Sequence, residues 1–386
     1  MNRSGMMAFT GTLTANGATG SALAVTDGEI SRRIGFANFG GGRTYSWPQI
    51  NDAGKVIARD RVTTESLIRT WDSAKPGTFE TLVSTVTSFS PEFGSVTLPT
   101  LANDGGSGFV GVPDSGDTAF YCNPFAVRDD VEHLVDLDGG GIRPMAADGG
   151  RFVLRDGAGT SGPVIFMQRG ALRDTEEIIA DTGVEQPWDA TGAAPGISSD
   201  GKIIAFAATL SGAGAAAINA AQSDVLPLQG TTGIYLAMLR KDAKPLYLQV
   251  AGISGNDRYE AGETFTDTNQ NGVFDPGEAD TGEITAIDFD NRVAVERMEG
   301  NIESQYQICF TGKNSTGHQT VFSKRINTTF LTRSGYPYYF HEPVLKVVSA
   351  GDQIEGLGSP VASLQLYDPL SATGVVAVHA VLDDND

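Results

Sequence analysis

Short runs of alternating apolar and polar residues recur along the chain, and each run follows a turn sequence that contains glycine. Examples begin at Asn2 (NRSGMMAFTGTL), at Ile50 (INDAGKVIARDRV) and at Ile197 (ISSDGKIIAFAATL). Asn-Asp-Ala-Gly and Ser-Asp-Gly are tight-turn sequences, because Gly and Asn accept positive φ. The alternation after each turn is typical of a β-strand with one or both faces buried. The pattern therefore predicts a series of strands introduced by tight turns.

The turn and its strand occur seven times, with successive spacings of 49, 52, 44, 51, 90 and 83 residues. A short apolar segment, often after a proline, precedes each turn, as in SWPQIN and TLPTLAN. Two further apolar segments follow most of the runs, which gives four strands per repeat. We name these strands A (before the turn), B (after it), C and D. The residues that anchor the seven turns are Gly5, Gly54, Gly106, Gly150, Gly201, Asn291 and Gly374.

Four-stranded units that repeat every 40 to 50 residues are typical of the blades of a β-propeller. We therefore expect an all-β fold, a β-propeller that spans residues 1–386 as a single domain. The chain begins at a B strand and stops after one. Two arrangements follow: six blades with one spare B strand, or seven blades with incomplete ends, and we favour seven repeats around one ring. Three insertions interrupt the repeats, at 211–232 (Ala-rich), 253–283 (acidic) and 327–343 (aromatic).

PQINDAGKVIARDRV and MNRSGMMAFTGTL resemble the tandem repeat N-x-x-G-x-x-A-F of bacterial extracellular, choice-of-anchor proteins. PGISSDGKIIAFAAT is similar to the blade repeat of Tol-system-type propellers. The resemblance covers nearly the whole chain but is degenerate: Asn291 stands for Gly, and RFVLR lacks the Ala-Phe pair. It implies a propeller in an exported bacterial protein, at the cell surface, in the periplasm or outside the cell. It implies no activity, because function lies in the loops of such folds.

The net charge of −20 argues against a nucleic-acid partner, because phosphate binding needs a basic face. The sequence contains no run of about eighteen apolar residues, the length needed to span a membrane. MNRSGMMAFTG lacks the basic and apolar regions of a signal peptide, so we expect either that the protein stays inside the cell or that its signal has been removed from this version of the chain, and the repeat resemblance favours the second. Cys122 and Cys309 both lie in apolar, strand-like segments, where a small buried thiol is the usual interpretation.

The dodecamer DTNQNGVFDPGE, at 267–278, places oxygen ligands as an EF-hand-like calcium loop requires. Gly272 stands at the sixth position, where the loop turns sharply. Hard oxygen ligands without His or Cys favour Ca²⁺ over zinc or copper. The flanking segments are not amphipathic helices, so we expect a structural ion that stiffens an insertion. The predicted ligands are Asp267, Asn269, Asn271, Val273 (through its carbonyl), Asp275 and Glu278.

In an antiparallel blade the B–C and D–A connections emerge on the same face, so we expect all three insertions on one face. The aromatic insertion carries candidate contacts to a protein or carbohydrate partner, although the pattern favours packing of the insertion onto the blade edges. They are Tyr336, Tyr338, Tyr339, Phe340 and His341. Two functions remain open. One is a calcium-stabilised binding or structural module that presents this face to a partner. The other is a Ca²⁺-dependent hydrolase or lyase that acts on a polymer at the channel mouth, although no catalytic motif is evident.

Overall fold

The computed structural model describes most of the chain. The residues outside the description are 3, 16–17, 39–41, 87–91, 115, 124–131, 137–143, 158–159, 170–174, 223–227, 229, 242, 254–283, 301–304, 329–343 and 384–386.

Antiparallel strands dominate the described residues, where they form seven sheets in chain order. The first sheet holds β1 (Met7–Ala15), β2 (Ala18–Thr26) and β3 (Ser31–Asn38). The second holds β4 (Thr44–Ile50), β5 (Lys55–Val62), β6 (Glu65–Asp72) and β7 (Phe79–Ser84). The third holds β8 (Phe93–Leu101), β9 (Ser107–Pro113), β10 (Ala119–Asn123) and β11 (Glu132–Asp136). The fourth holds β12 (Met145–Ala147), β13 (Arg151–Arg155), β14 (Val164–Gln168) and β15 (Thr175–Ala180).

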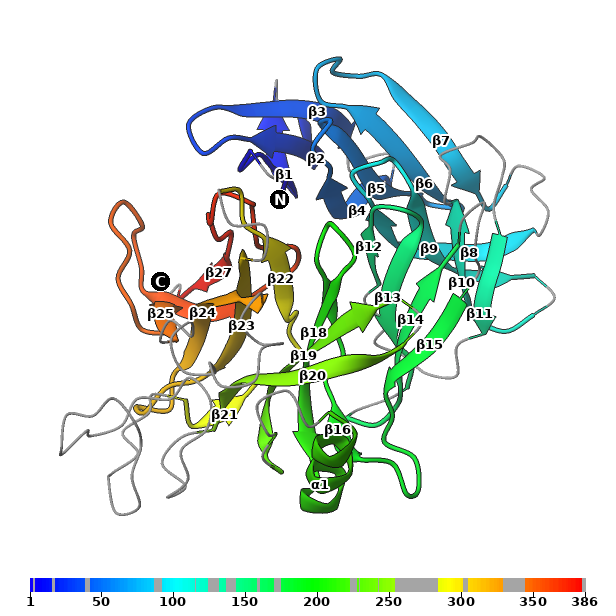
Figure 1. Ribbon diagram of the computed structural model, residues 1–386. Helices are drawn as coiled ribbons and strands as arrows, with labels where there is room; N and C mark the ends of the chain where they lie inside the picture. Colours follow the sequence, from blue (N-terminus) through cyan, green and yellow to red (C-terminus); the bar gives the residue numbers. More distant parts are fainter. Residues whose placement is uncertain are drawn as a thin grey trace.

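The later sheets are less regular. The fifth holds β16 (Trp188–Thr191), β17 (Gly196–Ile197), β18 (Ile203–Leu210), β19 (Thr232–Arg240) and β20 (Ala243–Gly252). The sixth holds β21 (Ala286–Ile287), β22 (Ala294–Arg297), β23 (Gln305–Lys313), β24 (Gln319–Asn327) and β25 (Leu345–Ser349). The seventh holds β26 (Val361–Gln365) and β27 (His379–Leu382). Figure 1 shows the sheets following one another around a ring, with the first and seventh sheets facing each other across a gap. The chain folds as a β-propeller, as the repeat predicts.

Among the residues that the structure describes, the hydrophobic core is divided into six clusters, and each cluster fills the space between two successive sheets. The side chains of β18 alternate between two of these clusters. Ile203, Ala205 and Ala207 pack toward the sixth sheet, while Ile204 and Phe206 pack toward the fourth. Successive side chains of a strand point to opposite faces, so a strand between two sheets is apolar on both. Within the described residues no such cluster joins the seventh sheet to the first.

The ends of the chain decide between six and seven blades. β1 and β27 belong to separate sheets, so the last strand does not add to the first sheet. Within the described residues the ring has seven sheets, of which the first has three strands and the seventh two. The first sheet begins at a B strand and the seventh ends at one. The preferred prediction of seven repeats with incomplete ends is therefore confirmed.

The predicted turns are confirmed in their conformation at five anchors, where positive φ is found at Gly5, Gly54, Gly150, Gly201 and Gly374. In the third sheet the turn glycine is Gly105 rather than Gly106. Gly105 has a φ of 94° and donates its N–H to Ala102 O.

The prediction that Asn291 anchors the sixth turn is wrong, because no B strand follows Asn291. β22 follows it and pairs with β23 on the same side as β21, so β22 occupies the A position. The A–B connection comes later and is closed by Met298 N, which donates to Gln305 O at 2.9 Å. The Asn291 side chain instead donates to Asp288 within a break in the A strand.

The Ala-rich insertion contains a helix, α1 (Gly212–Ala221), in the connection between β18 and β19. Ser211 caps its N-terminus, since its Oγ accepts a hydrogen bond from Gly214 N at 2.9 Å. This is a B–C connection, on the face where the sequence predicts the insertions.

The A–B turns form a chain of contacts from sheet to sheet. Ser199 N and Oγ both donate to the Glu296 carboxylate, which joins the fifth sheet to the sixth. Glu299 N donates to Ala372 O at 2.8 Å, which joins the sixth to the seventh. The seventh meets the first where the α-amino group of Met1 donates to Asp368 O at 2.7 Å. Polar contacts thus cross the gap that the hydrophobic clusters leave open.

Candidate ligand-binding site at the ring axis

The two sites predicted from motifs, the acidic dodecamer 267–278 and the aromatic segment 336–341, lie outside the described residues. Among the residues that are described, no three His, Cys, Asp or Glu side chains are grouped to hold a metal ion. In the same part of the chain, no helix has the length and apolar character needed to cross a membrane. The predicted burial of both cysteines is confirmed, and burial raises the pKa of the Cys309 thiol.

A cavity of about 480 Å³ lies where the first strands of the sheets converge, beside the gap between the first and seventh sheets. This volume is in the range of small-molecule sites. Its wall comes from β1, from the ends of β4 and β8, and from segments of the later sheets that reach the axis. The lining residues are Met1, Met7, Ala8, Phe9, Thr10, Ser46, Trp47, Pro48, Gln49, Ile50, Leu98, Pro99, Pro144, Arg292, Tyr367, Asp368, Ala377, Val378 and His379. We call this cavity the axial pocket.

Aromatic side chains and prolines give the axial pocket its apolar wall. Phe9, Trp47 and Tyr367 are each more than a third exposed. The Tyr367 and His379 rings meet edge to face with centroids 5.9 Å apart. An apolar wall with a few polar groups suits a ligand that combines an apolar body with a few polar atoms.

Two lining residues, Trp47 and Leu98, have left-handed backbone conformations, with φ of 57° and 49°. Each precedes a proline, and each lies at a break in the pairing of its A strand with the B strand. A left-handed conformation costs a residue with a Cβ roughly 1–2 kcal/mol. Strain of this kind clusters at binding sites, where it fixes a side chain in place. Here it places Trp47 and Leu98 at equivalent points of the wall in adjacent sheets.

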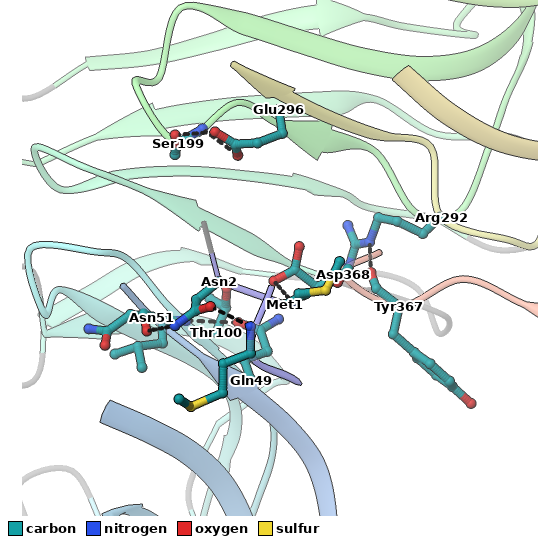
Figure 2. Close-up of polar contacts among 12 residues, drawn as sticks. Met1, Asn2, Gln49, Asn51, Thr100, Ser199, Arg292, Glu296, Tyr367 and Asp368 are labelled. Carbon is teal, nitrogen blue, oxygen red and sulfur yellow. Dashed lines mark hydrogen bonds and ion pairs between the residues drawn. The ribbon is translucent and has the colours of Figure 1, made fainter. Parts of the chain in front are cut away.

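Arg292 closes the far side of the axial pocket and ties four sheets together. It lies on the sixth sheet, is almost fully buried, and donates to three backbone carbonyls. Nε donates to Tyr367 O at 3.0 Å, Nη2 to Pro144 O at 3.3 Å, and Nη1 to Pro195 O. The three carbonyls belong to the seventh, fourth and fifth sheets. Figure 2 shows the guanidinium directed at Tyr367, beside Asp368 and Met1.

A smaller cavity of about 40 Å³ shares residues with the axial pocket and lies among the A–B turns. Its polar groups include Ser199, Glu296 and Asp368. Figure 2 shows Glu296 turned toward Ser199, so this carboxylate is engaged between two sheets. Asp368 lies 3.3 Å from the α-amino group of Met1. Within the described residues His379 makes a ring contact with Tyr367 and no hydrogen bond to a carboxylate or hydroxyl.

Motif searching missed the axial pocket, although a signal was present. The segments before the turns repeat a proline at a fixed distance from the turn, as at Pro48, Pro99 and Pro195. Those prolines and the residues before them converge on the axis. No single segment contains enough of the wall to be recognised alone. The axial pocket also lies toward the A–B turns, on the side away from the B–C and D–A connections that carry the insertions.

Compared with known proteins, the chain matches no family profile and no curated sequence. Solved structures that resemble it include the tricorn protease, at 8% identity over 94% of this chain and 32% of that one, with a TM-score of 0.44. An uncharacterized protein from Listeria monocytogenes EGD-e is 9% identical over 98% and 92%, with a TM-score of 0.42. A puromycin-hydrolyzing peptidase from Mycobacterium tuberculosis is 13% identical over 85% and 52%, with a TM-score of 0.38. The chain thus spans about a third of the tricorn protease chain. Similarity at this level carries no information about ligand or activity.

Proposed function

We propose that this protein is a β-propeller binding module whose axial pocket holds a ligand with an apolar body and few polar atoms. The observation that carries the proposal is the wall of the axial pocket. Phe9, Trp47 and Tyr367 come from three different sheets, are held at the same cavity, and remain partly exposed there. Large apolar side chains that stay exposed in a concave site gain most when a ligand covers them.

We further propose that Ca²⁺ stabilises the module by binding the dodecamer 267–278, and that the protein works outside the cytoplasm. The ligand pattern of the dodecamer and the repeat resemblance support these statements. The connection that contains the dodecamer runs from β20 to β21, and so belongs to the D–A class. An ion there would stiffen the insertion-bearing face, while the axial pocket opens toward the turn side. The aromatic segment 336–341 is a further candidate for partner contact on the insertion-bearing face.

Saturation-transfer NMR with benzyl alcohol, an aromatic probe with one hydroxyl, tests the axial pocket. Ala377 lines the axial pocket and Val375 does not, although the two lie on one short segment. Ala377→Trp should fill the cavity and abolish the transfer, whereas Val375→Trp should leave it unchanged. Equal transfer to both variants, or none to the unmodified protein, would reject the axial pocket as a binding site.

A further inference from the structure

Two arginines lie side by side on one face of β5, in the second sheet. Arg59 and Arg61 are two residues apart, so their side chains point to the same side of the sheet. Ile57 shares that side and belongs to the hydrophobic cluster between the second and third sheets. The two arginines therefore continue this cluster toward the end of β5 that connects to β6. This B–C end belongs to the insertion-bearing face, and neither arginine lines the axial pocket.

The neighbouring strands place hydroxyl groups beside the two arginines. On β4, Thr44 stands opposite Arg61 and Ser46 stands opposite Arg59 in the register. On β6, Ser66 stands opposite Arg61. Side chains at directly opposed positions of antiparallel strands have their Cβ atoms about 5 Å apart. These five residues share one side of the second sheet, and none of them carries a carboxylate. We call them the arginine patch.

The guanidinium of Arg59 has only part of its hydrogen bonds within the arginine patch. Its Nη2 donates to Ser66 Oγ at 3.0 Å. Its Nε is buried and has no hydrogen-bond partner in the described part of the chain. Burial, and secondly the charge of Arg61, lower the pKa of the Arg59 guanidinium. A buried donor without an acceptor is destabilising, so a ligand that supplies an acceptor and a negative charge is favoured here.

The opposite side of the same strands shows how this protein satisfies two other arginines. There Asp60 is fully buried and accepts from Arg43 Nε at 2.8 Å and from Arg69 Nη1. One internal carboxylate thus lies between two guanidinium groups and neutralises part of their charge. Among the described residues no carboxylate forms an ion pair with Arg59 or Arg61. The arginine patch therefore keeps two positive charges in a chain whose net charge is −20.

We infer that the arginine patch binds the phosphate group of a small phosphate monoester. Guanidinium groups match phosphate oxygens in charge and in geometry. A dianion balances both arginines, and its oxygens accept from Arg59 Nε, from Arg61 and from the hydroxyls of Thr44 and Ser46. Arg61 is exposed, so the ester oxygen has room on its side of the patch. The net charge of −20 opposes a polyanion, which favours a small molecule with one phosphate group. This site does not depend on the axial pocket.

A ³¹P NMR titration with methyl phosphate tests the inference, at constant ionic strength and about pH 8, where a monoester carries close to two negative charges. The unmodified protein should show one saturable site. Arg61→Gln should weaken binding at least tenfold and leave the fold intact, because Arg61 is exposed. Arg59→Lys retains the charge but removes Nε and the planar fork, so it should also weaken binding at least tenfold. Arg240→Gln is the control, since it removes the charge of an exposed arginine in the fifth sheet and should change the Kd less than twofold.

The outcomes are distinct from those of the proposed function, because benzyl alcohol in the axial pocket should not displace methyl phosphate. Equal affinity of Arg61→Gln and Arg240→Gln would place any bound phosphate elsewhere and overturn the inference. Binding of inorganic phosphate without methyl phosphate would mean that the arginine patch takes the free ion, and the monoester would be wrong. If acetate competes as strongly as inorganic phosphate, the arginine patch does not select phosphate, and the inference again fails. If methyl phosphate does not bind at all, the inference is overturned while the axial pocket stays unaffected.

Discussion

The Asn51 side chain reaches from the second sheet to the third, where its Nδ2 donates to Ala102 O at 3.2 Å. Its Oδ1 accepts from Lys55 N at 2.9 Å and so closes its own turn. Asn2 repeats both contacts one sheet earlier, accepting from Met6 N and donating to Asn51 O. Asn at the head of the turn therefore does two things at once. It holds the glycine turn closed and fastens that turn to the next sheet.

Replacing Asn51 separates these two roles. Asn51→Ala should lower the free energy of unfolding by about 2 kcal/mol, because a buried amide and a buried carbonyl lose their side-chain partner. Asn51→Asp retains the acceptor for Lys55 N but loses the donor to Ala102 O, so its cost should be smaller. Urea denaturation of the three proteins measures the difference. No loss for Asn51→Asp would mean that the contact to the next sheet contributes nothing, whereas equal losses for the two variants would mean that the contact from Lys55 N contributes nothing.

Among the residues at the ring axis, substitution of Arg292 should lower the free energy of unfolding the most. Arg292→Met removes a donor from carbonyls of three sheets, and we expect a loss of about 3 kcal/mol or more. Arg292→Lys keeps the charge, but one ammonium group cannot reproduce the planar fork, so most of the loss should remain. Arg240→Lys is the matched control, since Arg240 is exposed and serves a single carbonyl, that of Lys244. If Arg292→Lys and Arg240→Lys each lower the free energy of unfolding by less than about 0.5 kcal/mol in thermal or urea unfolding, the Arg292 contacts do not hold the sheets together.

Asp288 should make part of the stability depend on pH. Burial acts to raise the pKa of its carboxyl, but hydrogen bonds from Asn291, Asp290 N, Gln319 and Thr311 outweigh burial and lower the pKa below its usual value of 3.8. A lowered pKa means that the charged form is favoured in the folded protein. Its contribution is therefore complete above the pKa of the unfolded chain, and is lost as the pH falls through the folded pKa.

The test compares Asp288→Asn with the unmodified protein across this window. The difference in free energy of unfolding should be largest near neutral pH and shrink as the pH falls below about 4. Asp290→Asn is the control, because Asp290 is exposed and its contact to Asp288 uses the backbone amide. A difference for Asp288→Asn that does not change with pH would contradict the account.

The dodecamer 267–278 should bind Ca²⁺ and stabilise the fold. At a free Ca²⁺ concentration of about 100 times the Kd, one site adds about 2.7 kcal/mol and raises the Tm. Asp267→Ala combined with Glu278→Ala should abolish both the calorimetric titration and the Tm increase, while the sheets stay folded. Asp290→Ala with Glu299→Ala removes the same charge elsewhere and should leave both intact. Equal Ca²⁺ responses in the two double variants would place any ion outside the dodecamer.

The repeats were predictable because each turn needs a local residue type. Gly54 and Gly201 adopt positive φ, and the alternation after them matches burial on both faces. Asn291 misled the prediction for a physical reason. A polar residue followed by RVAVERM looks like another turn and strand, yet the Asp288 carboxylate turns the chain inside the A strand there. The true A–B connection follows Met298 and lacks the repeat's motif.

The axial pocket was not predictable from local patterns. Its wall joins Phe9 to His379 across almost the whole chain, and the left-handed conformation of Trp47 has no signature in sequence beyond the proline that follows it. Arg292 likewise reads as a surface residue beside acids. Only the closure of seven sheets around one axis buries it against three carbonyls.

The central claim is that a ligand occupies the axial pocket, and Trp47 reports on this directly. Trp47 is 38% exposed at the axial pocket, whereas Trp71 and Trp188 are each only 2% exposed. Acrylamide quenching of tryptophan fluorescence therefore measures access to Trp47, with the Trp47→Phe variant as the baseline. We predict that benzyl alcohol protects Trp47 fluorescence from acrylamide in the unmodified protein. Val375→Trp should show the same protection after the fluorescence of its added tryptophan is subtracted. Trp47→Phe should show no fluorescence component that benzyl alcohol protects. Unchanged quenching of Trp47 at saturating benzyl alcohol would contradict the account.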